Sequence, residues 1–197
     1  MVASLDLRKA FDTIEHYALF DALREQDLLP SEIALLLDLY TDQRGSANGN
    51  AEFDILRGVK QGDTLSSLLF NAGLEHAFKK WKNRLKDHGI LFAYDKERLT
   101  NVRYADDILL FGKNIDEISD MLEILCEELR AIGLEMHPSK TKILTSSSPC
   151  PFQFLDVDGM MINVLSSMES HKYLGRLISL NPAMRVTAEL KNRINAV

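Results

Sequence analysis

Two neighbouring aspartates, Asp106 and Asp107, lie between two apolar segments in the sequence VRYADDILLF. The apolar and aromatic residues on either side predict two strands joined by a tight turn. Two like charges at the tip of a hairpin repel each other and lose hydration unless solvent or a cation compensates them. The pair is therefore either an exposed, solvated turn or part of a site for a divalent cation such as Mg²⁺, which prefers oxygen ligands.

The remaining helices and strands follow one another without the regular alternation of a doubly wound sheet. This order favours an α+β fold in which helices pack on one face of an antiparallel sheet. Asp12 is expected to cap the first helix, and the dipeptides Asn48-Gly49 and Asp158-Gly159 predict hairpin turns. The main expected elements are strands at 1–7 and 52–56 and helices at 12–27, 31–43, 64–87 and 114–132.

Composition excludes several classes of protein. A length of 197 residues suits one domain. No apolar run approaches the length of a membrane span, and the N-terminus lacks the pattern of a signal peptide, so we expect an intracellular protein, nuclear or cytoplasmic, without a membrane partner. Cys126 and Cys150 have no C-x-x-C spacing, which argues against disulfide frameworks and zinc sites. The net charge of −6 argues against a surface dominated by phosphate contacts.

A third carboxylate, Asp6, lies near the end of the first expected strand, in SLDLRKAFD. This strand end could lie beside the turn that carries Asp106 and Asp107. Three carboxylates could then hold two metal ions, which together clamp the attacking and leaving oxygens of a phosphoryl displacement. The sequence therefore points to nucleotidyl transfer.

Five segments resemble the palm motifs A to E of reverse transcriptases, in their order: LDLRKAFD, GVKQGDTLSSLLFN, YADD, GLEMHPSKTK and YLG. The similarity is greatest to the enzymes of non-long-terminal-repeat, LINE-type retrotransposons. It implies a polymerase palm over residues 1–180 without fingers, followed at 181–197 by the start of a truncated connection or thumb. It also implies an RNA-directed DNA polymerase that extends a DNA primer on an RNA template with deoxynucleoside triphosphates. The alternative is a truncated retroelement-derived palm that binds metal or nucleic acid without turnover.

The resemblance also implies roles for individual residues. Two Mg²⁺ ions, or Mn²⁺ as a substitute, would bind to Asp6, the backbone carbonyl of Leu7, and Asp106. Asp107 would complete the acidic cluster. Lys140 would protonate the departing pyrophosphate, or it is an ordinary surface lysine. Tyr173, Leu174 and Gly175 would form the primer grip, or they are part of a short buried strand.

Three further residues match positions that contact the incoming nucleotide. Phe11 corresponds to the aromatic residue that selects deoxynucleotides by crowding the sugar 2′ position, and its alternative role is in the core. That residue disfavours an RNA-dependent RNA polymerase. Gln61 and Gly62 would line the nucleotide and the template base, or they belong to an ordinary glycine loop before a helix.

A basic segment closes the long expected helix. It is either a favourable charge distribution at a helix C-terminus or a patch that contacts a nucleic-acid backbone. The basic residues of the segment are Lys79, Lys80, Lys82, Arg84 and Lys86, around Trp81.

The sequence departs from the family pattern in two motifs. The departures are Asp63, Thr64 and Ser67 after the loop glycines and His137 before PSK.

Overall fold

The computed structural model describes residues 1–47, 51–91, 97–147, 150–184 and 186. The chain divides into two compact units. The first unit contains Met1–Leu7, Leu85–Ile124 and Met136–Val197, and the second contains Arg8–Arg84 and Leu125–Glu135. The expected Asn48-Gly49 turn lies outside the described residues.

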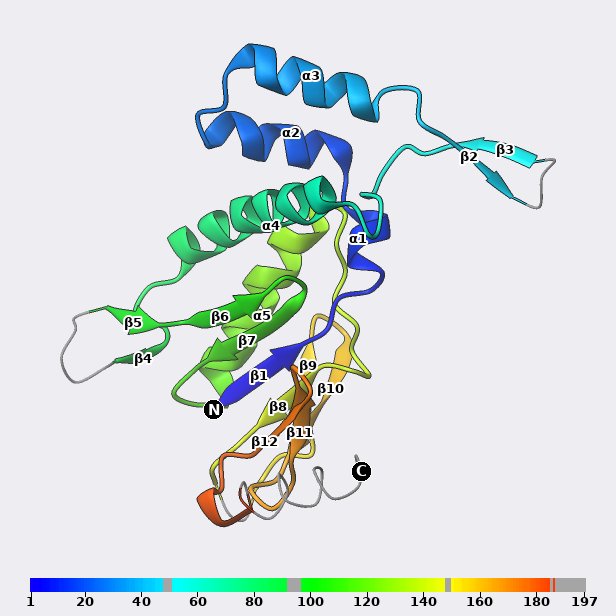
Figure 1. Cartoon of the computed structure of the whole chain (residues 1–197). Coiled ribbons are helices and arrows are strands. Elements are labelled where there is room, and N and C mark those ends of the chain that lie inside the picture. Colours follow the sequence, from blue (N-terminus) through cyan, green and yellow to red (C-terminus); the bar gives the residue numbers. More distant parts are fainter. Residues whose placement is uncertain (48–50, 92–96, 148–149, 185, 187–197) are drawn as a thin grey trace. The chain divides into compact units, whose positions relative to one another are not determined.

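A six-stranded sheet forms the centre of the first unit, in the order β6-β7-β1-β8-β10-β9 (Figure 1). Neighbouring strands are antiparallel except for β8 and β10, which pair in parallel. All four residues of β1 are buried, as is typical of a central strand. The strands are β1 (Val2–Leu5), β6 (Asn101–Tyr104), β7 (Asp107–Phe111), β8 (Lys142–Leu144), β9 (Phe154–Val157) and β10 (Met160–Leu165).

Two smaller hairpins belong to the same unit. The first pairs β4 (Ile90–Leu91) with β5 (Arg98–Leu99), and the second pairs β11 (His171–Tyr173) with β12 (Arg176–Ile178). The turn between β9 and β10 is the expected one: Asp158 and Gly159 have φ angles of 53° and 77°. Positive φ at both central residues matches the right-handed twist of the flanking strands.

The helix α5 (Ile115–Arg130) follows the expected apolar pattern closely. Ile118, Leu122, Leu125 and Leu129 recur at three- and four-residue steps and are fully buried. Asn114 caps the helix, since its Oδ1 accepts the backbone N–H of Glu117 at 2.9 Å.

The second unit is built from helices and one hairpin. α2 packs against both α3 and α4. The core of this unit contains the fully buried side chains of Leu19, Phe70, Phe78 and Trp81. Figure 1 shows these three helices and the β2–β3 hairpin. The elements are α1 (Ala10–Thr13), α2 (His16–Glu25), α3 (Pro30–Tyr40), β2 (Arg44–Ala47), β3 (Ala51–Asp54) and α4 (Thr64–Arg84).

The single helix expected over residues 12–27 is wrong. The structure breaks it at Ile14, whose backbone is extended and whose side chain is fully buried. The break lets the carbonyl of Ile14 accept the N–H of Gly58 at 2.7 Å, and it lets Glu15 form a β-bridge with Arg57. Asp12 is consequently the third residue of α1 rather than an N-cap. Within the described part of the chain, no helix combines the length and the apolarity needed to cross a membrane.

Candidate functional site

The three expected catalytic carboxylates all lie in the first unit, at the ends of neighbouring strands. Leu5 pairs with Ile108 across β1 and β7, so continuing this register by one residue sets Asp6 opposite Asp107. On the other side of β7, Tyr104 pairs with Asp107, which leaves Ala105 and Asp106 as the two-residue turn. The predicted tight turn is present, but it consists of Ala105 and Asp106, and Asp107 is the first residue of β7.

The charges of Asp106 and Asp6 act on the carboxylate of Asp107. The pKa of Asp107 is raised above its ordinary value by burial, and further by repulsion from Asp106 and then from Asp6. Oδ1 of Asp6 is buried and has no hydrogen-bond partner among the described residues. Nζ of Lys140 lies 3.4 Å from this oxygen, an ion pair whose geometry falls short of a hydrogen bond. Lys140 is thus the nearest compensating cation that the structure records for Asp6.

The segment before β8 holds the backbone of Asp6 on both sides. The N–H of His137 donates to the carbonyl of Asp6 at 2.8 Å, and the N–H of Asp6 donates to Oγ1 of Thr141 at 3.3 Å. Thr141 is fully buried. Sequence reasoning missed this residue, because a threonine between two lysines gives no local sign that its hydroxyl is bound to a distant backbone. His137 makes this contact through its backbone N–H. The departure of its side chain from the family pattern therefore leaves the contact in place.

A divalent cation suits these donors by chemistry. Carboxylate oxygens are the ligands that hard cations prefer, and a buried oxygen without a hydrogen bond, such as Oδ1 of Asp6, is costly unless a charge compensates it. Leu7 forms a β-bridge with Met136 directly after Asp6, which fixes the backbone that carries the expected carbonyl ligand. As placed, no three His, Cys, Asp or Glu side chains of the described ranges lie close enough together to form a metal-binding group.

The expected primer-grip residues form the β11–β12 hairpin, also in the first unit. The hydroxyl of Tyr173 donates to the backbone carbonyl of Asp107 at 3.4 Å. Burial and then the charge of Asp107 raise the pKa of this phenol. Leu174 and Gly175 form the turn, with φ angles of 47° and 76°. The structure therefore brings Tyr173 to the strand that carries Asp107.

The expected nucleotide-binding residues lie in the second unit. Phe11, in α1, is partly exposed and stacks on Phe70 of α4, with 4.5 Å between the ring centroids. Its carbonyl accepts the N–H of Val59 at 2.6 Å. Phe11 thus combines a contact with the core and an exposed portion of the ring, so both of its expected roles fit its position.

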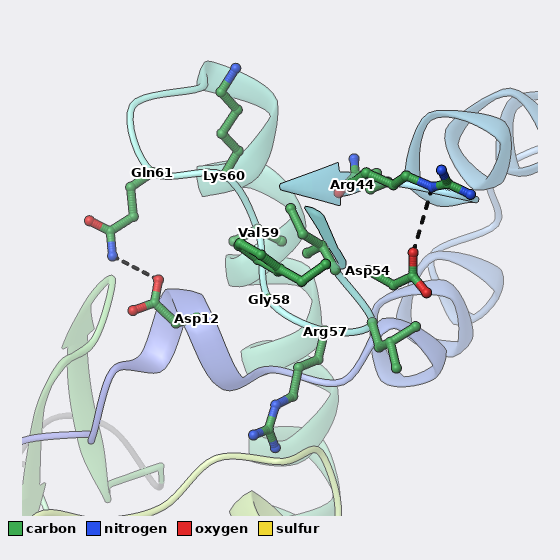
Figure 2. A pocket seen from close by; sticks show the side chains of 12 residues that line it. Asp12, Arg44, Asp54, Arg57, Gly58, Val59, Lys60 and Gln61 are labelled. Atoms are coloured by element: carbon green, nitrogen blue, oxygen red, sulfur yellow. Dashed lines mark hydrogen bonds and ion pairs between the residues drawn. The ribbon is translucent and has the colours of Figure 1, made fainter. Parts of the chain in front are cut away.

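The glycine loop, residues 58–63, places Gln61 near its tip and links it to α1. Nε2 of Gln61 donates to Oδ1 of Asp12 at 2.9 Å (Figure 2). Gly62 has a φ of +87°, a conformation that other residues rarely adopt. An open pocket of about 1040 Å³ adjoins this loop, lined by Asp12, Gln43, Arg44, Phe53, Asp54, Ile55, Leu56, Arg57, Gly58, Val59, Lys60 and Gln61.

The basic segment at the end of α4 does not present all its side chains in the same way. Lys79, Lys80 and Lys82 are exposed, whereas Trp81 is fully buried and packs edge-on against Phe78. Arg84 forms ion pairs at 2.8 Å to Glu128 and 2.6 Å to Glu127, and hydrogen bonds to these two carboxylates raise its pKa. Lys86 is exposed in the first unit.

Comparison with known families places the chain among polymerases. Residues 1–178 match the family described as reverse transcriptase (RNA-dependent DNA polymerase). A similar curated protein is the retrovirus-related Pol polyprotein from type-1 retrotransposable element R2 of Popillia japonica, 29% identical over 191 residues that make up 90% of this chain and 30% of that protein. The corresponding polyprotein of Bradysia coprophila is 32% identical over 147 residues, 73% of this chain and 16% of its own length. The chain thus spans less than a third of these relatives.

Solved structures of two telomerases share the fold of this chain. A telomerase of Candida albicans, in complex with a fragment of telomeric RNA, superposes with a TM-score of 0.54 at 17% identity, over 82% of this chain and 29% of that one. An apo telomerase of Candida tropicalis gives the same TM-score at 16% identity. These likenesses confirm the predicted α+β palm, and the curated relatives confirm the predicted resemblance to non-long-terminal-repeat retrotransposons.

Proposed function

Because the chain belongs to the reverse transcriptase (RNA-dependent DNA polymerase) family, we propose that it extends a DNA primer on an RNA template with deoxynucleoside triphosphates. The observation that carries this proposal is the placement of Asp6, Asp106 and Asp107 at the ends of paired strands β1 and β7. The raised pKa of Asp107 and the buried oxygen of Asp6, which is paired with the charge of Lys140, mark the place as one where negative charge is concentrated. A site of this kind favours cations and the chemistry that cations assist.

Asp6, Asp106 and Asp107, with the backbone carbonyl of Leu7, would hold two Mg²⁺ ions, or two Mn²⁺ ions in their place. When bound, the ions would lower the pKa of the primer hydroxyl and neutralise charge on the phosphates. The chain itself supplies rigidity, since His137 and Thr141 bind the backbone of Asp6 from both sides.

Lys140 has a position suited to proton transfer. Its ammonium group already lies 3.4 Å from a carboxylate oxygen of the proposed site, and its side chain is more than half exposed and therefore free to move. We assign it the donation of a proton from Nζ to the leaving pyrophosphate, a role that a positioned ammonium can fill.

Phe11, Gln61 and Gly62 are proposed to contact the incoming nucleotide. The exposed portion of the Phe11 ring would exclude a 2′-hydroxyl by steric contact, since its stacking on Phe70 keeps the ring from turning away. The Gln61 amide offers hydrogen-bonding groups, and the positive φ of Gly62 lets the loop turn sharply beside it.

Nucleic-acid contacts are assigned to two further groups of residues. Tyr173, Leu174 and Gly175 would hold the primer end, and the exposed Lys79, Lys80, Lys82 and Lys86 would contact phosphates. Arg84 is better described as a structural residue, because Glu127 and Glu128 already neutralise it. Residues 1–180 would form the palm, and the expected start of a connection or thumb at 181–197 lies mostly outside the described residues.

A primer-extension assay with exchanged nucleotides tests this assignment. The chain is incubated with a DNA primer annealed to an RNA template, Mg²⁺, and either deoxynucleoside or ribonucleoside triphosphates. We expect extension with deoxynucleotides and at least about tenfold less with ribonucleotides. Equal use of both nucleotides would overturn the role of Phe11, and preference for ribonucleotides would overturn DNA synthesis itself.

A further inference from the structure

Asp12 is not among the residues to which the family resemblance gives a role, yet it contacts one of them directly. Its Oδ1 accepts a hydrogen bond from Nε2 of Gln61 at 2.9 Å, across 49 residues of sequence (Figure 2). Both side chains are exposed, so the contact lies where a ligand could reach it.

The backbone around this contact is fixed on both sides. Val59 and Gly58 donate to the carbonyls of Phe11 and Ile14 at 2.6 and 2.7 Å, which anchors the start of the glycine loop to α1 and the residue after it. A side chain at Gly58 would lie 2.7 Å from the carbonyl oxygen of Asp12, so the two segments touch. Asp12 is therefore held at a fixed distance from the base of the loop.

Gln61 itself lies further along, beyond this anchored part. The loop closes there through the N–H of Asp63, which donates to the carbonyl of Lys60 at 3.3 Å. A glutamine side chain has three rotatable bonds, and an exposed one samples many rotamers unless a partner holds it. The hydrogen bond to Asp12 supplies such a partner.

We propose that Asp12 is a positioning residue that holds the Gln61 amide in one orientation for the incoming nucleotide. This inference rests on the proposed function, in which Gln61 contacts that nucleotide. An ionised carboxylate only accepts hydrogen bonds, so the nitrogen of the amide faces Asp12. Oε1 and the second N–H of Nε2 then remain for the ligand, in a defined direction.

The hydrogen bond between Asp12 and Gln61 contributes to the affinity for the nucleotide rather than to the stability of the fold. An exposed hydrogen bond adds little to stability, because water competes for both partners. Fixing the side chain before the ligand arrives removes an entropy cost from binding, which corresponds to a change of about two- to tenfold in affinity for one immobilised side chain.

The test is a double-mutant cycle on nucleotide binding. The dissociation constant of thymidine triphosphate with Mg²⁺ is measured for the wild-type chain, Asp12→Ala, Gln61→Ala and the double variant. We expect Asp12→Ala to weaken binding by about two- to tenfold and the double variant to bind no more weakly than Gln61→Ala alone. Asp12→Asn should restore most of the affinity, because its amide oxygen can still accept the bond.

Asp21→Ala is the matched control, since it removes another exposed carboxylate of the second unit together with its 2.6 Å ion pair to Arg24. It should bind as the wild type does. If Asp12→Ala binds like the wild type while Gln61→Ala is weakened, the inference is wrong. Additive losses in the double variant would also overturn it, because Asp12 would then act independently of Gln61.

A second readout separates this inference from the proposed function. The side-chain amide signals of Gln61 in a nitrogen-proton NMR spectrum, assigned by their loss in Gln61→Ala, should shift in Asp12→Ala without any ligand. Shifted signals with unchanged nucleotide affinity in Gln61→Ala would support the contact but remove its proposed role in binding, and the positioning inference would fall with that role. Unshifted signals would overturn the inference alone.

Discussion

Nζ of Lys140 lies 3.4 Å from Oδ1 of Asp6, a buried oxygen that accepts no hydrogen bond from the part of the chain that the structure describes. The ammonium group compensates this carboxylate, which directly follows the last recorded pair of β1 and β7, Leu5 with Ile108. A divalent cation bound to the same oxygen would therefore compete with Lys140. The two proposed roles of the site, metal binding and proton donation, consequently involve the same pair of residues.

Lys140→Met should separate these two roles. Removing the ammonium group removes a competing cation, so we expect Mn²⁺ to bind about two- to fivefold more tightly, as measured by electron paramagnetic resonance. Primer extension should slow by about a hundredfold, because the proton donor is lost. Lys142→Met is the control, since that ammonium group donates to the carbonyl of Ser139 instead. Weaker Mn²⁺ binding in Lys140→Met would contradict this account.

Asp107→Asn should raise the thermal stability of the metal-free chain at neutral pH. The pKa of Asp107 is higher in the folded chain than its ordinary value of 3.8. The folded state therefore binds the proton more tightly than the unfolded state does. The stability contributed by this group falls as the pH rises from the ordinary pKa through the raised one. The asparagine variant avoids this loss, although the gain is small because the carboxylate is only partly buried.

Melting curves at several pH values without divalent ions check this prediction. The difference in Tm between Asp107→Asn and the wild type should vanish below the ordinary pKa, where the carboxyl is protonated in both states. A difference that grows as the pH falls would show that the sign is wrong.

Phe11→Val should weaken the selection of deoxynucleotides. The smaller side chain leaves room for a 2′-hydroxyl, so the ratio of kcat/KM for deoxynucleotides to that for ribonucleotides should fall by about tenfold or more. Phe70→Leu removes the same ring stacking without shortening Phe11, so it should lower the ratio by less than Phe11→Val does. Equal losses of selectivity in both variants would assign Phe11 to the core alone.

Gly58→Ala and Gly62→Ala form a matched pair in the glycine loop. Both positions have positive φ angles, +84° and +87°, but a side chain at Gly58 would lie 2.7 Å from the carbonyl of Asp12. Nothing in the described part of the chain would lie within 4 Å of a side chain at Gly62. We expect losses of about 3 kcal/mol for Gly58→Ala and about 1 kcal/mol for Gly62→Ala in urea unfolding. Equal losses would show that α1 and the loop do not touch as described.

The local elements of the carboxylate site could be read from the sequence. Asp106 and Asp107 lie between two apolar segments, a pattern that is typical of two strands joined by a tight turn. The helix α5 was equally predictable, because its apolar residues recur at helical spacing over the whole of its length. Such patterns record local geometry, which depends on neighbouring residues.

Contacts between distant segments could not be read in this way. The pattern over residues 12–27 is helical, yet the burial of Ile14 and its backbone bond to Gly58 break the helix. The hydroxyl of Thr141 and the pairing of Arg84 with Glu127 and Glu128 likewise depend on residues far along the chain. Tertiary contacts outweigh local preference at each of these positions.

Mg²⁺-dependent extension of a DNA primer on an RNA template, compared between the wild-type chain and Asp106→Asn, tests the central claim most directly. The substitution keeps the size of the side chain but removes one of the three proposed carboxylates, so we predict extension by the wild type and a loss of about a thousandfold or more in the variant. Extension by the Asp106→Asn variant at the wild-type rate would contradict the account, because the chemistry would then not depend on the carboxylates at this strand turn.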